Sequence, residues 1–122
     1  MIKSILTPTR NRPNNCERFI RSVYNTADKK ENVEMLFYVD NDDPAINAYK
    51  SLELHSRKEF EDFKNIKFIF SEPQSVSISW NDLAEKCTGD VLIMGNDDLV
   101  YQTPSWDELL DVELKQFEKD EI

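Results

Sequence analysis

Residues 88–99 read TGDVLIMGNDDL, and the rest of the chain is interpreted around this stretch. The apolar run Val91–Met94 has the length and composition of a buried strand bounded by turn residues. It is followed by a glycine, an amide and two adjacent carboxylates, Asp97 and Asp98. Ligands of open α/β sheets bind at the carboxyl ends of strands, and carboxylates suit Mg²⁺ or Mn²⁺. The stretch therefore predicts a metal-bridged diphosphate site, although Asn and Asp are equally typical of a solvated turn.

Length and charge limit the kinds of protein that this sequence can form. The chain has 122 residues, so we expect residues 1–122 to form a single compact domain. The formal net charge of −9 argues against nucleic acid or an anionic membrane surface as a partner. An acidic chain that binds a phosphate-bearing ligand needs a metal ion or a few well-placed arginines to do so.

Cysteine content and hydropathy favour a cytoplasmic protein. Cys16 and Cys87 are too few for a disulfide framework or a zinc site, and each falls on a predicted apolar helix face. Residues 1–6 lack the longer apolar core of a signal peptide, and no run approaches transmembrane length. We therefore expect a soluble, cytoplasmic chain without a transmembrane segment.

Four apolar runs predict four β-strands, and a helical pattern follows each of them. The strands are predicted at Ile2–Leu6, Val33–Val39, Ile66–Phe70 and Val91–Met94. Helices are predicted from Pro13 through Val23, from Ala45 to about Phe60 or Phe63, over Val76–Cys87 and after Ser105. This strict alternation predicts an α/β fold, with a mostly parallel sheet, right-handed crossovers and helices on both faces.

Two helix ends carry apparent capping signals. Gly89 is placed to cap the third helix, and Ser105 with Glu108 has the spacing of a capping box for the fourth. The buried face of the fourth helix is predicted to consist of Trp106, Leu109, Leu110, Leu114 and Phe117. Its opposite, solvated face is predicted to carry Asp107, Glu108, Asp111, Glu118 and Asp120.

Three acidic or polar loops follow the first, second and fourth strands. They are Thr7–Arg12, Asp40–Asp43 and Asn96–Asp98. In a parallel sheet all three emerge at the same edge. A strand order of 3-2-1-4 would place a switch point between the first and fourth strands, where we expect the loops to converge on a ligand.

Four short motifs occur along the chain in a fixed order. They are the strand and loop at Ile5–Arg12, the strand ending Tyr38–Asn41, the segment Trp80–Ala84 with the later Gly89-Asp90 turn, and Asn96–Asp98. Together they resemble the family 2 glycosyltransferases of GT-A fold, from Ile2 to about Ser105. The resemblance implies a Rossmann-like GT-A domain that binds a nucleotide sugar, as the N-terminal part of a longer enzyme.

The resemblance also implies roles for particular residues. The nucleotide-sugar site would comprise Thr7, Pro8, Thr9, Arg10, Asp40, Asn96 and Asp97. Asp40 would accept a hydrogen bond from the base, and Asp97 would hold the ribose or the donor sugar. Asp98, the last acid of this DXD-like motif, would ligate the Mn²⁺ or Mg²⁺ that bridges the diphosphate. The implied reaction is transfer from a UDP- or GDP-sugar to an acceptor hydroxyl, with inversion by direct displacement.

The chain departs from the family pattern at two points. The first acid of the metal-binding motif is an amide, Asn96, which leaves the site with one charge fewer. The second is that the family's general base and most of its acceptor pocket lie further along the chain, beyond Ile122. We therefore expect the donor half of an enzyme, with weak or absent transfer by itself. Apolar surface left uncovered in such a half would favour self-association.

Other classes of protein share some of these features. A phospho-receiver domain has the same length, acidity and alternation, but its acidic pair follows the first strand, where this chain has Thr7-Pro8-Thr9. A sugar nucleotidyltransferase needs a glycine-rich loop after its first strand, and this chain has no such loop. A non-catalytic module that binds a nucleotide sugar or a metal remains open, because its sequence would look the same.

Several polar residues have a structural interpretation beside the functional one. Arg10 and Arg12 are placed either to contact a diphosphate or to pair on the surface with nearby acids. Asp42 and Asp43 are interpreted as turn formers before a proline. The only histidine, His55, lies among charged residues in the middle of a helix and is given no catalytic role.

Overall fold

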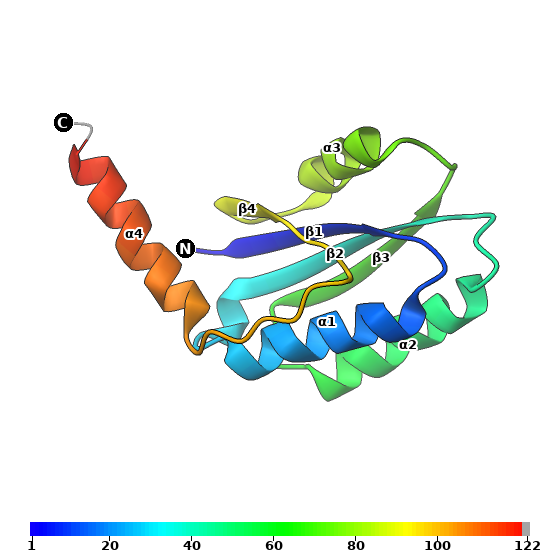
Figure 1. Cartoon of the computed structure of the whole chain (residues 1–122), viewed down its shortest axis with the longest axis horizontal. Helices are drawn as coiled ribbons and strands as arrows, with labels where there is room; N and C mark the ends of the chain where they lie inside the picture. Colours follow the sequence, from blue (N-terminus) through cyan, green and yellow to red (C-terminus); the bar gives the residue numbers. More distant parts are fainter. Residues whose placement is uncertain (121–122) are drawn as a thin grey trace.

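The computed structural model describes residues 1–120, with side chains through residue 116. The four strands are β1 (Lys3–Thr9), β2 (Val33–Asp40), β3 (Asn65–Ser71) and β4 (Val91–Met94). The helices are α1 (Pro13–Thr26), α2 (Ile46–Glu59), α3 (Val76–Lys86) and α4 (Trp106–Asp120), with a short 3₁₀ turn at Lys30–Asn32. The predicted alternation of strands and helices is therefore confirmed (Figure 1).

The strands form one parallel sheet in the order β3-β2-β1-β4, which confirms the predicted order. Leu6 of β1 lies at the centre, with Leu36 of β2 on one side and Met94 of β4 on the other. Receiver domains belong to the flavodoxin-like class, in which the order begins 2-1-3. The observed order thus excludes the receiver interpretation.

Helices cover both faces of the sheet, as predicted (Figure 1). On one face, α1 and α2 pack against Ile5 and its neighbours in a large aromatic-rich core that includes buried Cys16. On the other face, α3 packs against Leu6 in a smaller cluster around Leu83. Successive β1 residues enter different cores because side chains of a strand alternate between the two faces. The two clusters fix the sheet and thereby the loops at its edge.

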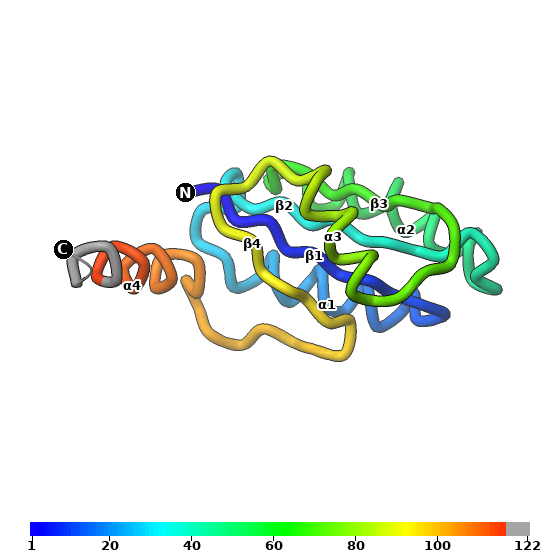
Figure 2. The backbone as a smooth tube through the Cα atoms, turned by 90° about the horizontal axis from the view of Figure 1, so that it is seen from above, coloured from blue at the N-terminus to red at the C-terminus, as the bar shows by residue number. Residues whose placement is uncertain are grey.

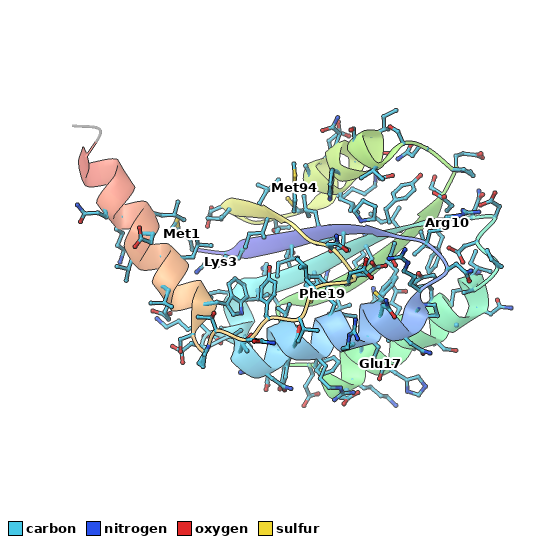
Figure 3. All side chains as sticks on the ribbon, in the orientation of Figure 1. Met1, Lys3, Arg10, Glu17, Phe19 and Met94 are labelled. Carbon is cyan, nitrogen blue, oxygen red and sulfur yellow. The ribbon has the colours of Figure 1, made fainter. Side chains whose placement is uncertain are left out.

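The edge strand β4 is only partly covered. Leu92 and Met94 on this strand are 49% and 69% exposed, and Figure 3 shows Met94 at the surface beside α3. Their neighbour Ile93 points to the opposite face and packs against the large core. Self-association through this apolar surface stays a prediction.

Gly89 does not cap α3, so that prediction is wrong. The helix ends at Lys86, the next residue is extended, and neither glycine has a positive φ. Gly89 instead lies against β1, where a Cβ atom would be 2.1 Å from Ser4 Oγ. Its role is to permit close approach of two backbone segments. The cap that α3 does have is at its start, where Ser75 Oγ accepts from the N–H of Ile78.

The prediction that Ser105 and Glu108 form a capping box for α4 is also wrong. Ser105 has a φ of 57°, and its N–H donates to the carbonyl oxygen of Thr26 at 2.7 Å. A Glu108 oxygen lies 3.5 Å from Lys29 Nζ, so this side chain pairs with a different segment. The long-range contacts of the loop override the local capping signal.

The predicted faces of α4 are partly wrong. Asp107, expected in solvent, is 1% exposed and accepts the backbone N–H groups of Asp28 and Lys29, each at 2.8 Å. Leu109, expected in the core, is 54% exposed. Figure 2 shows α4 running away from the sheet. The predictions for Phe117, Glu118 and Asp120 concern side chains outside those that the structure describes.

One further contact connects α4 to the sheet. A 2.7 Å ion pair joins the buried Lys3 of β1 to Asp111 of α4. Within residues 1–120, no helix is long and apolar enough to cross a membrane.

Candidate functional site

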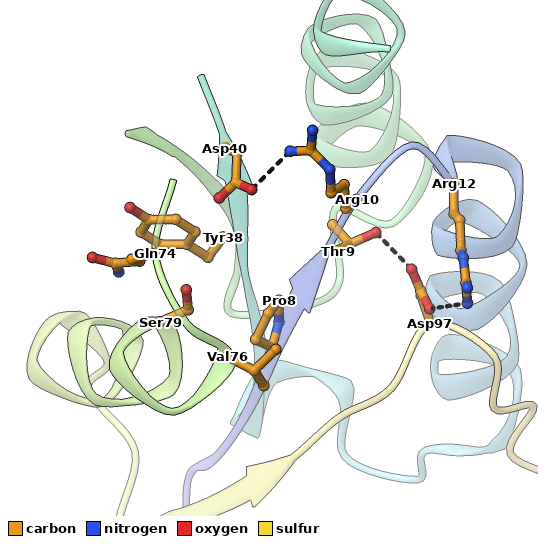
Figure 4. Close-up of a pocket in the computed structure, with 10 residues that line it drawn as sticks. All are labelled: Pro8, Thr9, Arg10, Arg12, Tyr38, Asp40, Gln74, Val76, Ser79 and Asp97. Carbon is orange, nitrogen blue, oxygen red and sulfur yellow. Dashed lines mark hydrogen bonds and ion pairs between the residues drawn. The ribbon is translucent and has the colours of Figure 1, made fainter. Parts of the chain in front are cut away.

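A cleft of about 290 Å³ opens at the edge of the sheet where β1, β2 and β4 end (Figure 4). Its lining consists of Pro8, Thr9, Arg10, Arg12, Tyr38, Asp40, Gln74, Val76, Ser79 and Asp97. The ends of β1 and β2, the loops that follow β1 and β4, the segment that leads from β3 into α3 and the start of α3 all contribute. The carboxyl ends of the strands thus converge on one concave surface.

The cleft brings together five of the residues predicted for the site. These are Pro8, Thr9, Arg10, Asp40 and Asp97. The structure places Thr7, Asn96 and Asp98 outside the lining. Sequence reasoning missed four lining residues, namely Tyr38, Gln74, Val76 and Ser79. Strand topology could have indicated this part of the lining. The segment at residues 71–75 follows the carboxyl end of a parallel strand, which lies at this same edge of the sheet.

Asp97 is the buried carboxylate of the cleft, and a chain of hydrogen bonds holds it in place. Its side chain accepts a 2.7 Å bond from Thr9 Oγ1. Thr9 Oγ1 lies 2.8 Å from Tyr49 Oη, which accepts from the backbone N–H of Arg12, also at 2.8 Å. Because Thr9 gives its only proton to Asp97, the phenol donates to Thr9. Burial of Tyr49 raises its pKa to about 12.

Asp40 lies at the other end of the cleft, beside an exposed arginine. Arg10 Nη1 is 2.8 Å from Asp40 and 3.1 Å from Asp42. These contacts, with Asp42 the larger contributor, raise the pKa of the Arg10 guanidinium. The predicted surface pairing of Arg10 is therefore observed, and it places a cation at the cleft mouth.

Asp98 lies on the rim, where two side chains of the first loop and α1 hold it. Arg12 Nη1 is 2.8 Å from Asp98 Oδ2, and the Asn15 amide donates to Asp98 Oδ1 at 3.2 Å. These two hydrogen bonds lower the pKa of Asp98. Its backbone N–H donates to Asn96 Oδ1 at 2.9 Å, so Asn96 acts as a turn former here.

Thr7 packs below the cleft rather than lining it. It is fully buried, and its hydroxyl has no hydrogen-bond partner among the described residues. A Cβ atom on Gly95 would be 2.2 Å from this hydroxyl. Only glycine therefore allows the chain that follows β4 to lie against β1 at this point.

Asp43 connects the first two loops. Its carboxylate accepts the N–H of Asn11 and that of Ala45, both at 2.8 Å. Asn11 has a φ of 50°, in the left-handed region that asparagine tolerates. The turn-forming role predicted for Asp43 is observed, and the same carboxylate fixes the loop that carries Arg10 and Arg12.

A divalent cation fits the chemistry of this site. Among the described side chains, those of residues 1–116, no cluster of three His, Cys, Asp or Glu suited to a metal is found. Mg²⁺ and Mn²⁺ sites in phosphate-binding proteins need fewer, because waters and phosphate oxygens supply the remaining ligands. Asp97 and Asp98 already share one cation, since Arg12 Nη1 lies 3.6 Å from the former and 2.8 Å from the latter.

Comparison with known families decides the class of protein. The profile of Glycosyl transferase family 2 matches residues 4–117. The chain belongs to this family. The match spans nearly all of the described fold, including all three loops that meet in the cleft, and it confirms the resemblance found in the motifs. No curated protein sequence gives a significant match.

Solved structures share the fold of this glycosyltransferase domain. The mannosyltransferase PcManGT from Pyrobaculum calidifontis, in complex with GDP-Man and Mn²⁺, has a TM-score of 0.70 at 13% identity. The alignment covers 83% of this chain and 28% of that one. TarS 1–349 from S. aureus in complex with UDP has a TM-score of 0.65 at 11% identity, with 91% and 31% covered. Identities this low show the fold alone, and this GT-A, Rossmann-like domain spans less than a third of either chain.

Proposed function

We propose that the cleft binds the nucleotide part of a UDP- or GDP-sugar, and that this chain is the donor half of a metal-dependent glycosyltransferase. The observation that carries the proposal is the cleft itself, which is lined by two carboxylates and two arginines and has a third carboxylate, Asp98, on its rim. This combination suits a ligand with ring N–H groups, hydroxyls and a diphosphate. The relatives of the same fold bind GDP-mannose with Mn²⁺ in one case and UDP in another.

Each end of the cleft suits a different part of the donor. Asp40 would accept a hydrogen bond from a base N–H, with Pro8 and Thr9 beside the base and ribose. Asp97 has one oxygen held by Thr9, which leaves the other to accept from a ribose or sugar hydroxyl. The Arg10 guanidinium at the mouth has the charge and the planar donors that phosphate oxygens need.

Asp98 is the proposed protein ligand of Mn²⁺ or Mg²⁺, with Asp97 close by. When bound, the metal would neutralise charge that develops on the leaving diphosphate. The proposed reaction is direct displacement by an acceptor hydroxyl with inversion. A general base is required to take the proton of that hydroxyl, and we propose that residues beyond Ile122 supply it.

Isothermal titration calorimetry tests the donor site. UDP and GDP are titrated into the native chain, each with Mn²⁺ and with EDTA, and the same titrations are repeated with Asp98→Ala. We expect one nucleotide to bind in the presence of Mn²⁺ and to lose at least tenfold in affinity in EDTA or in the variant. Circular dichroism establishes that both chains are folded.

The result also separates the alternatives. Failure of both nucleotides to bind a folded native chain would contradict the donor site and leave the acidic loops as turns. Metal-dependent binding that survives in Asp98→Ala would contradict the role of Asp98. Robust sugar transfer by residues 1–122 alone would contradict the proposal that the base lies elsewhere. A non-catalytic module predicts binding without transfer even in a longer chain that includes the acceptor half.

A further inference from the structure

The Arg12 guanidinium occupies the position between the two carboxylates of the DXD-like motif. Its Nη1 atom lies 2.8 Å from Asp98 Oδ2 and 3.6 Å from Asp97 Oδ1. Figure 4 shows Arg12 reaching from the start of α1 toward Asp97. A single guanidinium thus interacts with both acids and offsets one of their two negative charges, whereas a divalent ion at the same place would offset both.

Both carboxylate oxygens of Asp98 already accept a hydrogen bond. Oδ2 is taken by Arg12 and Oδ1 by the amide of Asn15. In this arrangement Asp98 is turned to α1 and is absent from the cleft lining, whereas Asp97 is part of it. A metal ion that uses Asp98 Oδ2 would therefore compete with the guanidinium for that oxygen.

Displacement of Arg12 is sterically and energetically accessible. The Arg12 and Asp98 side chains are 52% and 54% exposed, and exposed ion pairs are weak. The backbone of Arg12 is fixed independently, because its N–H donates to the buried Tyr49 Oη. The side chain can thus move while the loop stays in place. Arg12 also lines the cleft, so a released guanidinium remains within the site.

We infer that Arg12 is an exchangeable cation: it holds Asp98 when no metal is bound, and a divalent ion that takes Asp98 releases it toward the diphosphate. The inference rests on the proposed function and assigns Arg12 as a nucleotide-binding residue of the donor site. Arg12 opposes metal binding in the absence of nucleotide. It favours nucleotide binding once the metal is present, because a freed guanidinium forms charge-assisted hydrogen bonds with phosphate oxygens.

The test compares Mn²⁺ binding by the native chain and by Arg12→Gln, without nucleotide, using the electron paramagnetic resonance signal of free Mn²⁺. Removal of the competing ion pair is expected to tighten Mn²⁺ binding by about two- to fivefold. The matched control is Arg18→Gln, because Arg18 is exposed and acts on Asp98 through its charge, with no hydrogen bond to it. This control removes the same charge from α1, the helix that follows Arg12, and its effect on Mn²⁺ affinity should stay below about twofold.

A second titration measures the other half of the exchange. With Mn²⁺ saturating, Arg12→Gln should bind the nucleoside diphosphate about tenfold more weakly than the native chain. Opposite changes in metal and nucleotide affinity are the signature of the exchange, and damage to the loop would weaken both.

Several outcomes would overturn the inference. Unchanged or weaker Mn²⁺ binding by Arg12→Gln, beside measurable binding by the native chain, would refute the exchange and leave the donor site standing. An equal gain in Arg18→Gln would reduce the effect to general electrostatics. Absence of Mn²⁺ binding in both the native chain and Arg12→Gln would refute the metal site itself, and the exchange with it.

Discussion

Tyr49 Oη lies 2.8 Å from Thr9 Oγ1, and this hydrogen bond joins α2 to the end of β1 at the cleft. Thr9 in turn donates a hydrogen bond to Asp97, which lies 88 positions further along the chain. The buried phenol also accepts the N–H of Arg12. One side chain outside the cleft therefore fixes both the loop after β1 and the carboxylate after β4.

Tyr49→Phe should weaken both the fold and the site. Loss of the phenol leaves the Arg12 N–H and the Thr9 hydroxyl without their partner, which costs about 1–2 kcal/mol of unfolding free energy. We also expect severalfold weaker nucleotide binding, because Asp97 loses its support. Urea unfolding and calorimetry measure the two effects. Tyr24→Phe, which removes a phenol bonded to Asp62 away from the cleft, should leave nucleotide affinity unchanged.

The same phenol predicts a dependence of stability on alkaline pH. Burial raises the pKa of Tyr49 from 10.0 to about 12, so the folded state holds this proton more tightly than the unfolded state does. The resulting stability is fully present below pH 10 and is lost as the pH rises toward about 12. Urea unfolding between pH 9 and about 11 should show a steeper loss in the native chain than in Tyr49→Phe. Parallel curves would contradict the assignment to Tyr49.

Asp40 and Asp42 offer a matched pair for the base-binding role. Both pair with Arg10, but Asp40 lines the cleft and its side chain is 18% exposed, whereas that of Asp42 is 58% exposed. Asp40→Asn should weaken binding of the preferred nucleotide about tenfold, because the base N–H loses a charged acceptor. Asp42→Asn should change it by less than about twofold. Equal losses in the two variants would mean that only the net charge near Arg10 matters.

Gly95→Ala should destabilise the domain by about 1–3 kcal/mol, since the new methyl group would overlap Thr7 and Ile5. Thr7→Val alone should be neutral or slightly stabilising, because the Thr7 hydroxyl has no partner among the described residues. Combining Gly95→Ala with Thr7→Ala should recover part of the loss, as the nearest atom is removed. Urea unfolding of the native chain, Gly95→Ala, Thr7→Ala and the double variant forms a double-mutant cycle. Full additivity would show that the two residues are not in contact.

Asp107 anchors the start of α4, and its contribution should depend on acid pH. Burial acts to raise the pKa of Asp107, but hydrogen bonds from the N–H groups of Asp28 and Lys29 outweigh it and lower the pKa below 3.8. Asp107→Asn should therefore cost about 1–3 kcal/mol near neutral pH. That difference is present above the unfolded pKa of about 4 and shrinks as the pH falls through the folded value. Unfolding at pH 7 and pH 3 measures it.

A second substitution on α4 controls for general effects on the helix. Glu113→Gln changes the same charge at an exposed position and should alter stability little at either pH. An equal loss in both variants would contradict the anchoring role of Asp107.

Much of the fold was predictable because its signals are local. The apolar run Val33–Val39 predicts a strand covered on both faces, and the structure has β2 at Val33–Asp40. The period of Cys16, Phe19, Ile20 and Val23 predicts one buried helix face, and all four are buried. The signals failed where local and long-range contacts compete, as at Ser105, whose N–H is taken by Thr26 rather than by a helix cap.

The sequence by itself determined the α/β alternation, the parallel sheet and the meeting of three polar loops at one edge. Residue period and strand direction fix these features without reference to distant partners. Only the tertiary structure decided which of two adjacent acids enters the cleft. Asp97 turns inward to Thr9 and Asp98 turns outward to Arg12, partners 88 and 86 positions away. Neighbouring side chains of a turn point in different directions, and the groups packed around them select which one faces the ligand.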